Sequence, residues 1–271
     1  MQHRARKRFG QNFLEDSRVI QRIADTIAPR PGELILEIGP GQAALTSLLA
    51  TTGVELHLLE IDRDLAAGLE QRFHDSKNVQ VHCGDALQMD LSEISSKRSF
   101  RLVGNLPYNI STPLLFHVLR WRNLVIDMHF MLQQEVVNRM AAQPGGKTWG
   151  RLSIMCQYYC EVTPLFTVPP EAFRPAPKVQ SAVVRLVPHA APPVQVSDMP
   201  RFERLVAQAF SMRRKTLRNS LRGLLDVESI MAAGIDPGLR PEALDLAQFA
   251  ALAERIPRVT PENHDKPAGI S

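Results

Sequence analysis

Short apolar runs alternate with segments of helical periodicity through the first two-thirds of the chain, and this alternation limits the possible folds most strongly. The runs with strand character cover residues 34–38, 54–60, 79–83, 101–104, 125–132 and 181–187. Helical patterns between them include residues 43–52, 65–73 and 113–119. This order predicts an α/β domain in which a parallel sheet carries helices on both faces.

A helix is also expected ahead of the first strand. Its apolar residues recur at the spacing of one helix face, and they are Val19, Ile20, Ile23, Ala24 and Ile27. Asp16 or Ser17 is placed to cap the start of this helix. We expect its apolar stripe to pack on the sheet domain.

The composition changes in a proline-rich stretch after the last strand pattern. Residues 188–197 are expected to form a linker between a main domain over residues 1–187 and a smaller domain over residues 198–271. No strand pattern follows the linker. Helical stripes fit residues 202–210, 227–233 and 246–256, with Gly234 and Pro257 as stops. The second domain is therefore expected to be small and all-helical.

Basic residues concentrate near both ends of the chain, although the formal net charge is only +4. Between residues 201 and 222, one acid, Glu203, accompanies the basic residues Arg201, Arg204, Arg213, Arg214, Lys215, Arg218 and Arg222. The first ten residues add Arg4, Arg6, Lys7 and Arg8 without an acid. Two such clusters indicate a polyanionic partner. On this observation alone, a solvated helix face explains them equally well.

The chain has three cysteines, an odd number that argues against the disulfide framework of a secreted protein. Cys156 and Cys160 have the spacing of half a metal site. No further Cys or His lies at zinc-ligand spacing, so we expect buried thiols and no metal. No apolar stretch is long enough to span a bilayer, and the basic N-terminus leads into no apolar signal-peptide core. The expected compartment is the cytoplasm, without a membrane partner.

Glycines or polar side chains follow four successive strand patterns at the point where each strand ends. Gly39 and Gly41 follow the first, Glu60 closes the second, Asp85 follows the third and Asn105 follows the fourth. The carboxyl ends of parallel strands share one edge of a sheet, so these residues are expected to line one ligand crevice. The two glycines permit a tight turn and close approach of the backbone to the ligand.

These residue types suit a nucleoside ligand. The Glu60 carboxylate can accept hydrogen bonds from both ribose hydroxyls, and Asp85 can accept one from the exocyclic amine of adenine. The glycine motif also satisfies a permissive dinucleotide fingerprint that ends at Ala44, so NAD and S-adenosylmethionine compete as cofactors at this point. A third interpretation is that Glu60 and Asp85 only cap neighbouring helices.

The segment Asn105-Leu106-Pro107-Tyr108 carries the most information about chemistry. The exocyclic nitrogen of adenine is a poor nucleophile because its lone pair is delocalised into the ring. Two acceptors aimed at its N–H groups would make it more nucleophilic. Asn105 offers its side-chain oxygen and Leu106 its carbonyl, which Pro107 points by holding residue 106 extended. Tyr108 offers a face on which the base can stack.

This segment therefore predicts methyl transfer to an amino nitrogen of a base, achieved mostly by positioning. No strong general base is required, because a sulfonium donor is already activated and the methylated amine loses its proton to solvent. A simpler interpretation is a strand, a proline-containing turn and a helix capped by Ser111 or Thr112. The neighbouring nucleoside crevice favours methyl transfer.

Over nearly its whole length the chain resembles the KsgA-type small-subunit ribosomal RNA adenine N6,N6-dimethyltransferases. The matching motifs are KRFGQNFL (7–14), LEIGPG (36–41), GDAL (84–87), NLPYNIS (105–111), FRPAPKV (173–179) and RRKTL (213–217). The resemblance implies a seven-stranded class I, Rossmann-like methyltransferase domain that uses S-adenosylmethionine, followed by a helical domain. It implies as substrate two adjacent adenines near the 3′ end of 16S rRNA, each dimethylated within the immature small ribosomal subunit.

The resemblance also implies residue roles. Asn12 and Leu14 would contact the cofactor together with Gly39, Gly41, Glu60, Asp85 and Asn105. Phe173 would offer the target base a second aromatic face opposite Tyr108, although its proline-rich surroundings equally fit a core anchor. RNA phosphates would be contacted in the helical domain by Arg213, Arg214, Lys215 and Arg218. Off the ribosome we expect a monomer.

One position departs from the family pattern. The family usually has a third glycine two residues after Gly41, where this chain has Ala43. We expect the added methyl group to crowd the cofactor slightly without abolishing binding, because alanine fits the start of a helix.

Three other functions compete with this one. They are methylation of large-subunit rRNA as in antibiotic resistance, a non-catalytic role in ribosome assembly, and an NAD-linked oxidoreductase. The longer N-terminal motif and residues 213–217 favour the small-subunit substrate. The complete segment 105–108 favours catalysis, and the basic helices disfavour an oxidoreductase.

Overall fold

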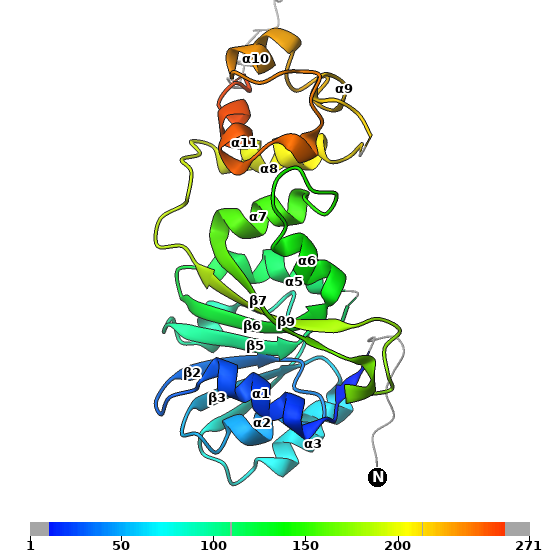
Figure 1. Ribbon diagram of the computed structural model, residues 1–271. Helices are drawn as coiled ribbons and strands as arrows, with labels where there is room; N and C mark the ends of the chain where they lie inside the picture. The colour runs from blue at the N-terminus through cyan, green and yellow to red at the C-terminus, as the bar shows by residue number, and fades with distance from the viewer. Residues whose placement is uncertain (1–10, 109, 213, 258–271) are drawn as a thin grey trace, which may run out of the picture. The chain divides into compact units, whose positions relative to one another are not determined.

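The computed structural model describes residues 11–108, 110–212 and 214–257 (Figure 1). The chain divides into two compact units, Met1–Pro193 and Val194–Ser271. Their boundary falls inside residues 188–197, the stretch expected to be a linker.

The first unit contains a seven-stranded sheet with the order β4-β3-β2-β5-β6-β9-β7. The strands are β2 (Leu34–Ile38), β3 (Glu55–Glu60), β4 (Val79–Cys83), β5 (Phe100–Asn105), β6 (Val125–Gln133), β7 (Cys160–Val168) and β9 (Ser181–Pro188). Strands β2 to β6 are parallel, whereas β9 is antiparallel to both β6 and β7. The prediction of a parallel sheet is therefore wrong for β7 and β9. Residues 169–180 join these neighbouring strands without a crossover α-helix, so the strands must pair antiparallel.

Strand β7 has no counterpart among the predicted apolar runs. It lies at the edge of the sheet, and its residues Glu161, Thr163 and Pro164 are exposed. The pairing of β7 with β9 shifts register between Pro164 and Phe166. Proline cannot donate to a strand neighbour and is tolerated at sheet edges and bulges. The edge position thus explains why polar residues and a proline interrupt the apolar pattern.

Helices cover both faces of the sheet (Figure 1). On one face α1 (Ser17–Ile27), α2 (Ala44–Leu49) and α3 (Arg63–Arg72) share a buried cluster with Ile35 and Leu56. On the other face Leu36 and Phe130 pack with side chains from the remaining helices. Those helices are α4 (Leu91–Ile94), α5 (Ser111–Val118), the 3₁₀ turn η2 (Leu119–Trp121), α6 (Gln134–Met140) and α7 (Arg151–Tyr159). The predicted Rossmann-like α/β class is confirmed.

The predicted leading helix is α1. The Asp16 carboxylate accepts hydrogen bonds from the backbone N–H groups of Arg18 and Val19, so Asp16 is the N-cap. The buried side chains of α1 are Ile20, Ile23, Ala24 and Ile27. They form the apolar stripe that was expected to pack on the sheet.

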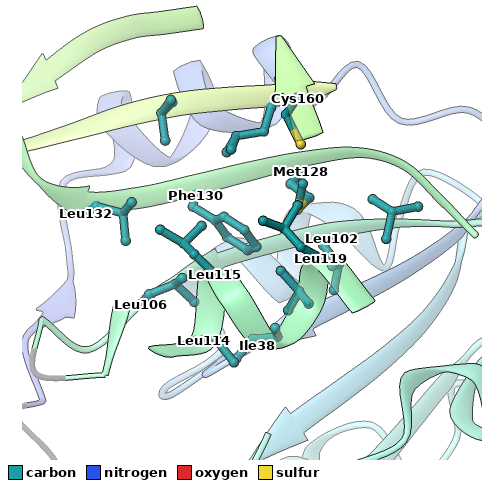
Figure 2. Close-up of a cluster of buried hydrophobic side chains, with 14 of the residues drawn as sticks. Ile38, Leu102, Leu106, Leu114, Leu115, Leu119, Met128, Phe130, Leu132 and Cys160 are labelled. Carbon is teal, nitrogen blue, oxygen red and sulfur yellow. The ribbon is translucent and has the colours of Figure 1, made fainter. Parts of the chain in front are cut away.

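The buried cluster on the α5 side anchors the loop that follows β5 (Figure 2). Leu114 and Leu115 of α5 lie in this cluster with Phe130 of β6. Leu106 is also fully buried there, directly after Asn105. Burying a leucine side chain stabilises a protein by about 1.5–3 kcal/mol. The backbone next to Asn105 is therefore held by the hydrophobic core.

Among the residues that the structure describes, the regular elements of the second unit are all helices or 3₁₀ turns. Its elements are α8 (Met199–Ala209), α9 (Leu217–Ser220), α10 (Val227–Ala232), the 3₁₀ turn η4 (Pro241–Ala243) and α11 (Leu246–Ala253). Phe202 of α8 and Phe249 of α11 are fully buried. Asp198, Asp226 and Asp245 cap α8, α10 and α11. Within the described ranges, neither unit has a helix of the length and apolar character that crossing a membrane requires.

Candidate functional site

A pocket lies where the carboxyl ends of β2, β3, β4 and β5 meet. It encloses about 1210 Å³, including its open mouth. Every strand-end residue predicted for the ligand crevice lines it: Gly39, Gly41, Glu60, Asp85 and Asn105. Asn12, Leu14, Leu106, Pro107 and Tyr108 line it as well. The structure thus brings together nearly all of the predicted site residues of the first unit.

Two glycines that line this pocket lie where a side chain would clash with neighbouring atoms. Gly41 has a φ of +56°, and a Cβ at this position would lie 3.1 Å from the Phe13 ring. Gly104 lies at the end of β5, where a Cβ would approach the Ile38 carbonyl oxygen to 2.4 Å. Such a contact is impossible without moving the backbone, so β5 passes close to β2 only because residue 104 has no side chain.

Glu60 is nearly inaccessible to solvent, with 3% of the residue exposed. It accepts hydrogen bonds from the backbone N–H of Gly41 at 3.1 Å and of Asp62 at 2.9 Å. Burial raises the pKa of Glu60, partly offset by these backbone hydrogen bonds. The N-cap of α3 is Asp62 rather than Glu60. Glu60 is therefore a fixed, desolvated acceptor, and the suggestion that it only caps a helix does not describe its contacts.

Asp85 is half-buried at the end of β4. Its carboxylate accepts from the backbone N–H of Leu87 at 3.0 Å and from the Gln88 side chain at 3.2 Å. These bonds stabilise its own turn, whereas the N-cap of the following helix α4 is Asp90. Each carboxylate oxygen has a second lone pair, so Asp85 can still accept from a ligand in the pocket.

Hydrogen bonds hold Asn105 at the end of β5, and Leu106 and Tyr108 in the segment that follows it. The Asn105 side-chain N–H donates to the backbone carbonyl of Asn12 at 3.0 Å, and the Leu106 N–H donates to the Met131 carbonyl at 3.1 Å. The Tyr108 hydroxyl lies 2.6 Å from the Ser181 hydroxyl. Burial raises the pKa of Tyr108, which keeps its ring neutral. The loop therefore presents a fixed amide and a fixed aromatic ring to the pocket.

The alternative expectation of a Ser111 or Thr112 cap on α5 is wrong. Ile110 is the N-cap, and its side chain makes no capping hydrogen bond. The Ser111 hydroxyl instead donates to the Tyr108 carbonyl at 3.1 Å. Ser111 thereby closes the turn that carries Tyr108.

Phe173 does not face the pocket. It forms β8 (Phe173–Arg174), which follows the 3₁₀ turn η3 (Pro170–Ala172) and pairs antiparallel with β1 (Phe13–Leu14). The Phe173 ring is fully buried in the cluster beneath α1, and it is absent from the pocket wall. The expected stacking face opposite Tyr108 is therefore not presented in this conformation. The position matches the other interpretation of Phe173, a core anchor.

Two buried titratable residues line the pocket and were not predicted. Glu37 of β2 accepts a hydrogen bond from the Thr46 hydroxyl at 2.7 Å, and burial raises its pKa to about 7. His129 of β6 is buried, and desolvation lowers its pKa to about 4, so its ring is neutral. Glu37 lies inside an otherwise apolar strand run, and His129 inside a run in which Asp127 is the other charged or titratable residue. A charged residue in a buried strand is the sequence signal that could have identified them.

Ala43 occupies a conformation that glycine would adopt more easily. It precedes α2 with a φ of +65°, and its methyl group is 1% exposed in the core beneath α1. Ala43 is not part of the pocket wall, whereas Ala44 is. Its methyl group therefore does not contribute to the wall of the pocket where a cofactor is expected. Its cost is left-handed backbone strain, about 1–2 kcal/mol for a residue with a Cβ.

The predicted RNA-contacting residues lie in the second unit. Arg214, Lys215 and Arg218 are exposed, and none of them forms an ion pair with another described residue. Arg213 lies outside the described residues. These unpaired cations are free to meet an anionic ligand.

Cys156 and Cys160 are buried thiols, as expected. Burial raises the pKa of Cys156 strongly and that of Cys160 to about 12, which makes both unreactive. Cys83 is exposed at the end of β4. Among the residues that the structure describes, no three His, Cys, Asp or Glu side chains are grouped to hold a metal ion.

Known proteins match this arrangement over most of the chain. The family model described as "Ribosomal RNA adenine dimethylase" matches residues 2–257. The ribosomal RNA small subunit methyltransferase A of Pseudomonas putida is 57% identical over 94% of this chain and 96% of its own length.

Solved structures share the fold. The 23S rRNA methyltransferase ErmE has a TM-score of 0.70 and 29% identity, covering 90% of this chain and 99% of its own. A dimethyladenosine transferase from Plasmodium falciparum has a TM-score of 0.75 and 24% identity, covering 89% and 95%. The matched residues include the whole pocket described above, and the chain therefore belongs to the ribosomal RNA adenine dimethylase family.

Proposed function

We propose that this chain transfers methyl groups from S-adenosylmethionine to the N6 amines of two adjacent adenines near the 3′ end of 16S rRNA, within the immature small ribosomal subunit. The observation that carries the proposal is that Asn105 and Leu106 line the same pocket as the buried acceptor Glu60. A site suited to a nucleoside therefore lies next to a loop whose oxygens can accept hydrogen bonds from an amine. We further propose that the enzyme acts in the cytoplasm and is monomeric off the ribosome.

We propose the small-subunit substrate because the chain shares more sequence identity with a small-subunit methyltransferase than with a 23S rRNA methyltransferase. The relative from Pseudomonas putida, named as a small-subunit methyltransferase, is 57% identical to this chain. ErmE, named as a 23S rRNA methyltransferase, is 29% identical. The shared fold supports methyl transfer to rRNA in both cases, and the closer identity supports the small-subunit substrate.

The pocket residues fit S-adenosylmethionine. Glu60 is a buried carboxylate with lone pairs for two ribose hydroxyls, and Asp85 lies at the next strand end for the adenine amine. Ile61 and Ala86 add apolar walls on which an adenine ring can lie. When bound, this cofactor supplies a methyl group on a positively charged sulfur. The chain itself only has to hold the acceptor amine in line with that group.

The loop after β5 would perform this positioning. The Asn105 side-chain oxygen and the Leu106 carbonyl accept from the two N–H groups of the target amine, which directs its lone pair toward the methyl group. The neutral Tyr108 ring stacks on the base and contributes about 1–3 kcal/mol to its binding. The proton is lost from the methylated amine to solvent, so no basic side chain is needed at the loop. Precise orientation of two reactants can lower a reaction barrier by about 7–11 kcal/mol.

The second unit would supply affinity for RNA. Its exposed cations Arg214, Lys215 and Arg218 suit phosphate groups, and Arg213 precedes them in the sequence. Phosphate contacts position RNA without reading its sequence. The specificity for two particular adenines would therefore come from the shape of the subunit and from the pocket.

The proposal is tested by methyl transfer with labelled donor to purified small subunits that lack these modifications. We expect up to two methyl groups on each of two adjacent adenines, mapped by primer extension. Asn105→Ala should lower the rate about 100-fold or more while RNA binding persists. Asn138→Ala, which truncates an exposed asparagine of α6, is the matched control and should leave the rate unchanged. Label that enters only large-subunit RNA would refute the small-subunit assignment.

A further inference from the structure

The side chain of Asn105 is tied to a segment far away in the sequence. Residues 11–14 line the pocket, and we call them the N-terminal strap. The Asn105 Nδ2 group donates a hydrogen bond to the backbone carbonyl oxygen of Asn12 at 3.0 Å. Among the described residues, the other end of this amide, Oδ1, has no hydrogen-bond donor. The side chain lines the pocket.

The strap is held on both sides, so the Asn12 carbonyl has a defined position. The Gln11 side chain donates to the Asp62 carboxylate at 3.4 Å. Phe13 packs over Gly41, and the pairing of β1 with β8 aligns Phe13 with Arg174. Immediately after the strap, the Glu15 N–H donates to the Ala172 carbonyl at 2.8 Å.

We infer that the backbone carbonyl of Asn12 orients the amide of Asn105, so that Oδ1 and not the NH₂ group faces the target amine. A primary amide is nearly symmetric in shape, and its two orientations differ chiefly in which end donates. A carbonyl oxygen only accepts, so it selects the orientation in which Nδ2 faces the strap. The reversed orientation would place NH₂ against the N–H groups of the adenine amine. This inference rests on the proposed function.

The inference also gives a physical reason for asparagine at position 105. A carboxylate there would be a stronger acceptor for the adenine amine, but one of its oxygens would face the Asn12 carbonyl. Two acceptors at 3.0 Å repel each other, and the strap that carries Asn12 would be displaced. Only a side chain with a donor on one branch and an acceptor on the other satisfies both neighbours. Asn12 is thus a positioning residue, and it acts through its backbone.

The test compares Asn105→Asp with Asn105→Ala and the unaltered enzyme from about pH 8 to about pH 6. A protonated carboxyl can donate to the Asn12 carbonyl and accept from the adenine amine, whereas the ionised form cannot donate. The rate of Asn105→Asp relative to the unaltered enzyme should therefore fall about tenfold for each pH unit by which the pH exceeds the carboxyl pKa, and rise as the pH is lowered. Taking this ratio at each pH cancels the titration of the other groups on the pocket wall, which are Glu37, Glu60, Asp85, Tyr108 and His129.

The outcomes separate the inference from the proposed function. An inactive Asn105→Ala with a ratio for Asn105→Asp that rises as pH falls supports both. An inactive Asn105→Ala with a flat ratio overturns the inference and leaves the proposed function standing. Full activity of Asn105→Ala overturns both. Calorimetric binding of S-adenosylmethionine at each pH shows that the compared variants are folded.

If Asn105→Asp does not fold, the unaltered protein still tests the inference. The side-chain NH₂ of Asn105, assigned in NMR spectra by its loss in Asn105→Ala, should exchange slowly with solvent. Asn78 is the slow reference, since its NH₂ donates to the carbonyls of Ala50 and Val54 at 3.1 and 2.9 Å. The exposed Asn138 is the fast reference. Exchange of Asn105 as fast as that of Asn138 overturns the inference.

Discussion

Replacing Glu60 by glutamine should weaken the binding of S-adenosylmethionine by roughly one to two orders of magnitude. In the structure the two carboxylate oxygens of Glu60 accept separately from Gly41 and Asp62, at 3.1 and 2.9 Å. Each oxygen keeps a lone pair for one ribose hydroxyl. Glutamine preserves the shape of the side chain but has an acceptor at only one of these two positions.

The magnitude follows from the hydrogen bond that is lost. A hydrogen bond to a charged group contributes about 1.5–3 kcal/mol, and glutamine removes one such bond to the ribose. This corresponds to an increase of about 10- to 100-fold in the dissociation constant. The thermal midpoint of the free protein should change little. Removing a buried charge offsets the loss of one backbone hydrogen bond, because burial already raises the pKa of Glu60.

Isothermal titration calorimetry with S-adenosylmethionine measures this effect directly. Glu55→Gln is the matched control, because Glu55 lies at the opposite end of β3 and pairs with Arg98 at 2.6 Å. A dissociation constant for Glu60→Gln within about threefold of the unaltered value would refute the assigned role. An equal loss in Glu55→Gln would show instead that the change acts through general destabilisation of β3.

Other consequences can be measured on the free protein and on its complex with RNA. Because the pKa of Glu37 is raised from 4.5 to about 7, the folded state binds more protons than the unfolded state in this window, and stability should fall as pH rises through it. Glu37→Gln should remove this pH-dependent loss of unfolding free energy, which is at most about 3 kcal/mol. Urea unfolding at several pH values measures it, and the same pH dependence in the variant would contradict this explanation. Ala43→Gly should change the free energy of unfolding by less than about 1 kcal/mol, since relief of left-handed strain is offset by a more flexible unfolded chain and a lost buried methyl group. Strong destabilisation in the same unfolding assay would show that packing of this methyl group dominates. Replacing the exposed Arg214, Lys215 and Arg218 together with glutamine should weaken RNA binding. In filter-binding assays, the slope of the logarithm of the binding constant against the logarithm of salt concentration should become shallower by roughly three. An unchanged slope would place the RNA surface elsewhere.

The strands near the pocket could be predicted closely, and the far edge of the sheet could not. β2 and β4 have the predicted bounds. β2 is buried along its whole length and is apolar except for Glu37, whereas β4 is an edge strand in which the half-buried Val79 and Val81 alternate with the exposed Gln80. β7 escaped prediction because an edge strand tolerates Pro164 and polar neighbours. Its antiparallel direction, like that of β9, follows from the connection between them rather than from their composition.

The structural setting of some residues near the pocket could likewise not be predicted from the sequence. Phe173 could be assigned either to the pocket or to the core from its sequence context, and the structure places its ring in the buried cluster under α1. Ala43 was expected at an ordinary helix start, whereas the turn before α2 requires a left-handed residue there. In both cases the deciding contact involves a partner distant in the chain, which local sequence does not specify.

The sequence by itself determined that Gly39, Glu60, Asp85 and Asn105 meet at one edge, because parallel strands with helical crossovers bring their carboxyl ends together. It also determined, through its motifs, the family to which the chain belongs. Only the tertiary structure decided how these groups are oriented. The bond from Asn105 to the Asn12 carbonyl spans 93 residues of sequence, and it exists because the strap packs against Gly41 and β8. The order of residues along a strand sets which groups reach the pocket, whereas packing between distant segments sets the direction in which each group points.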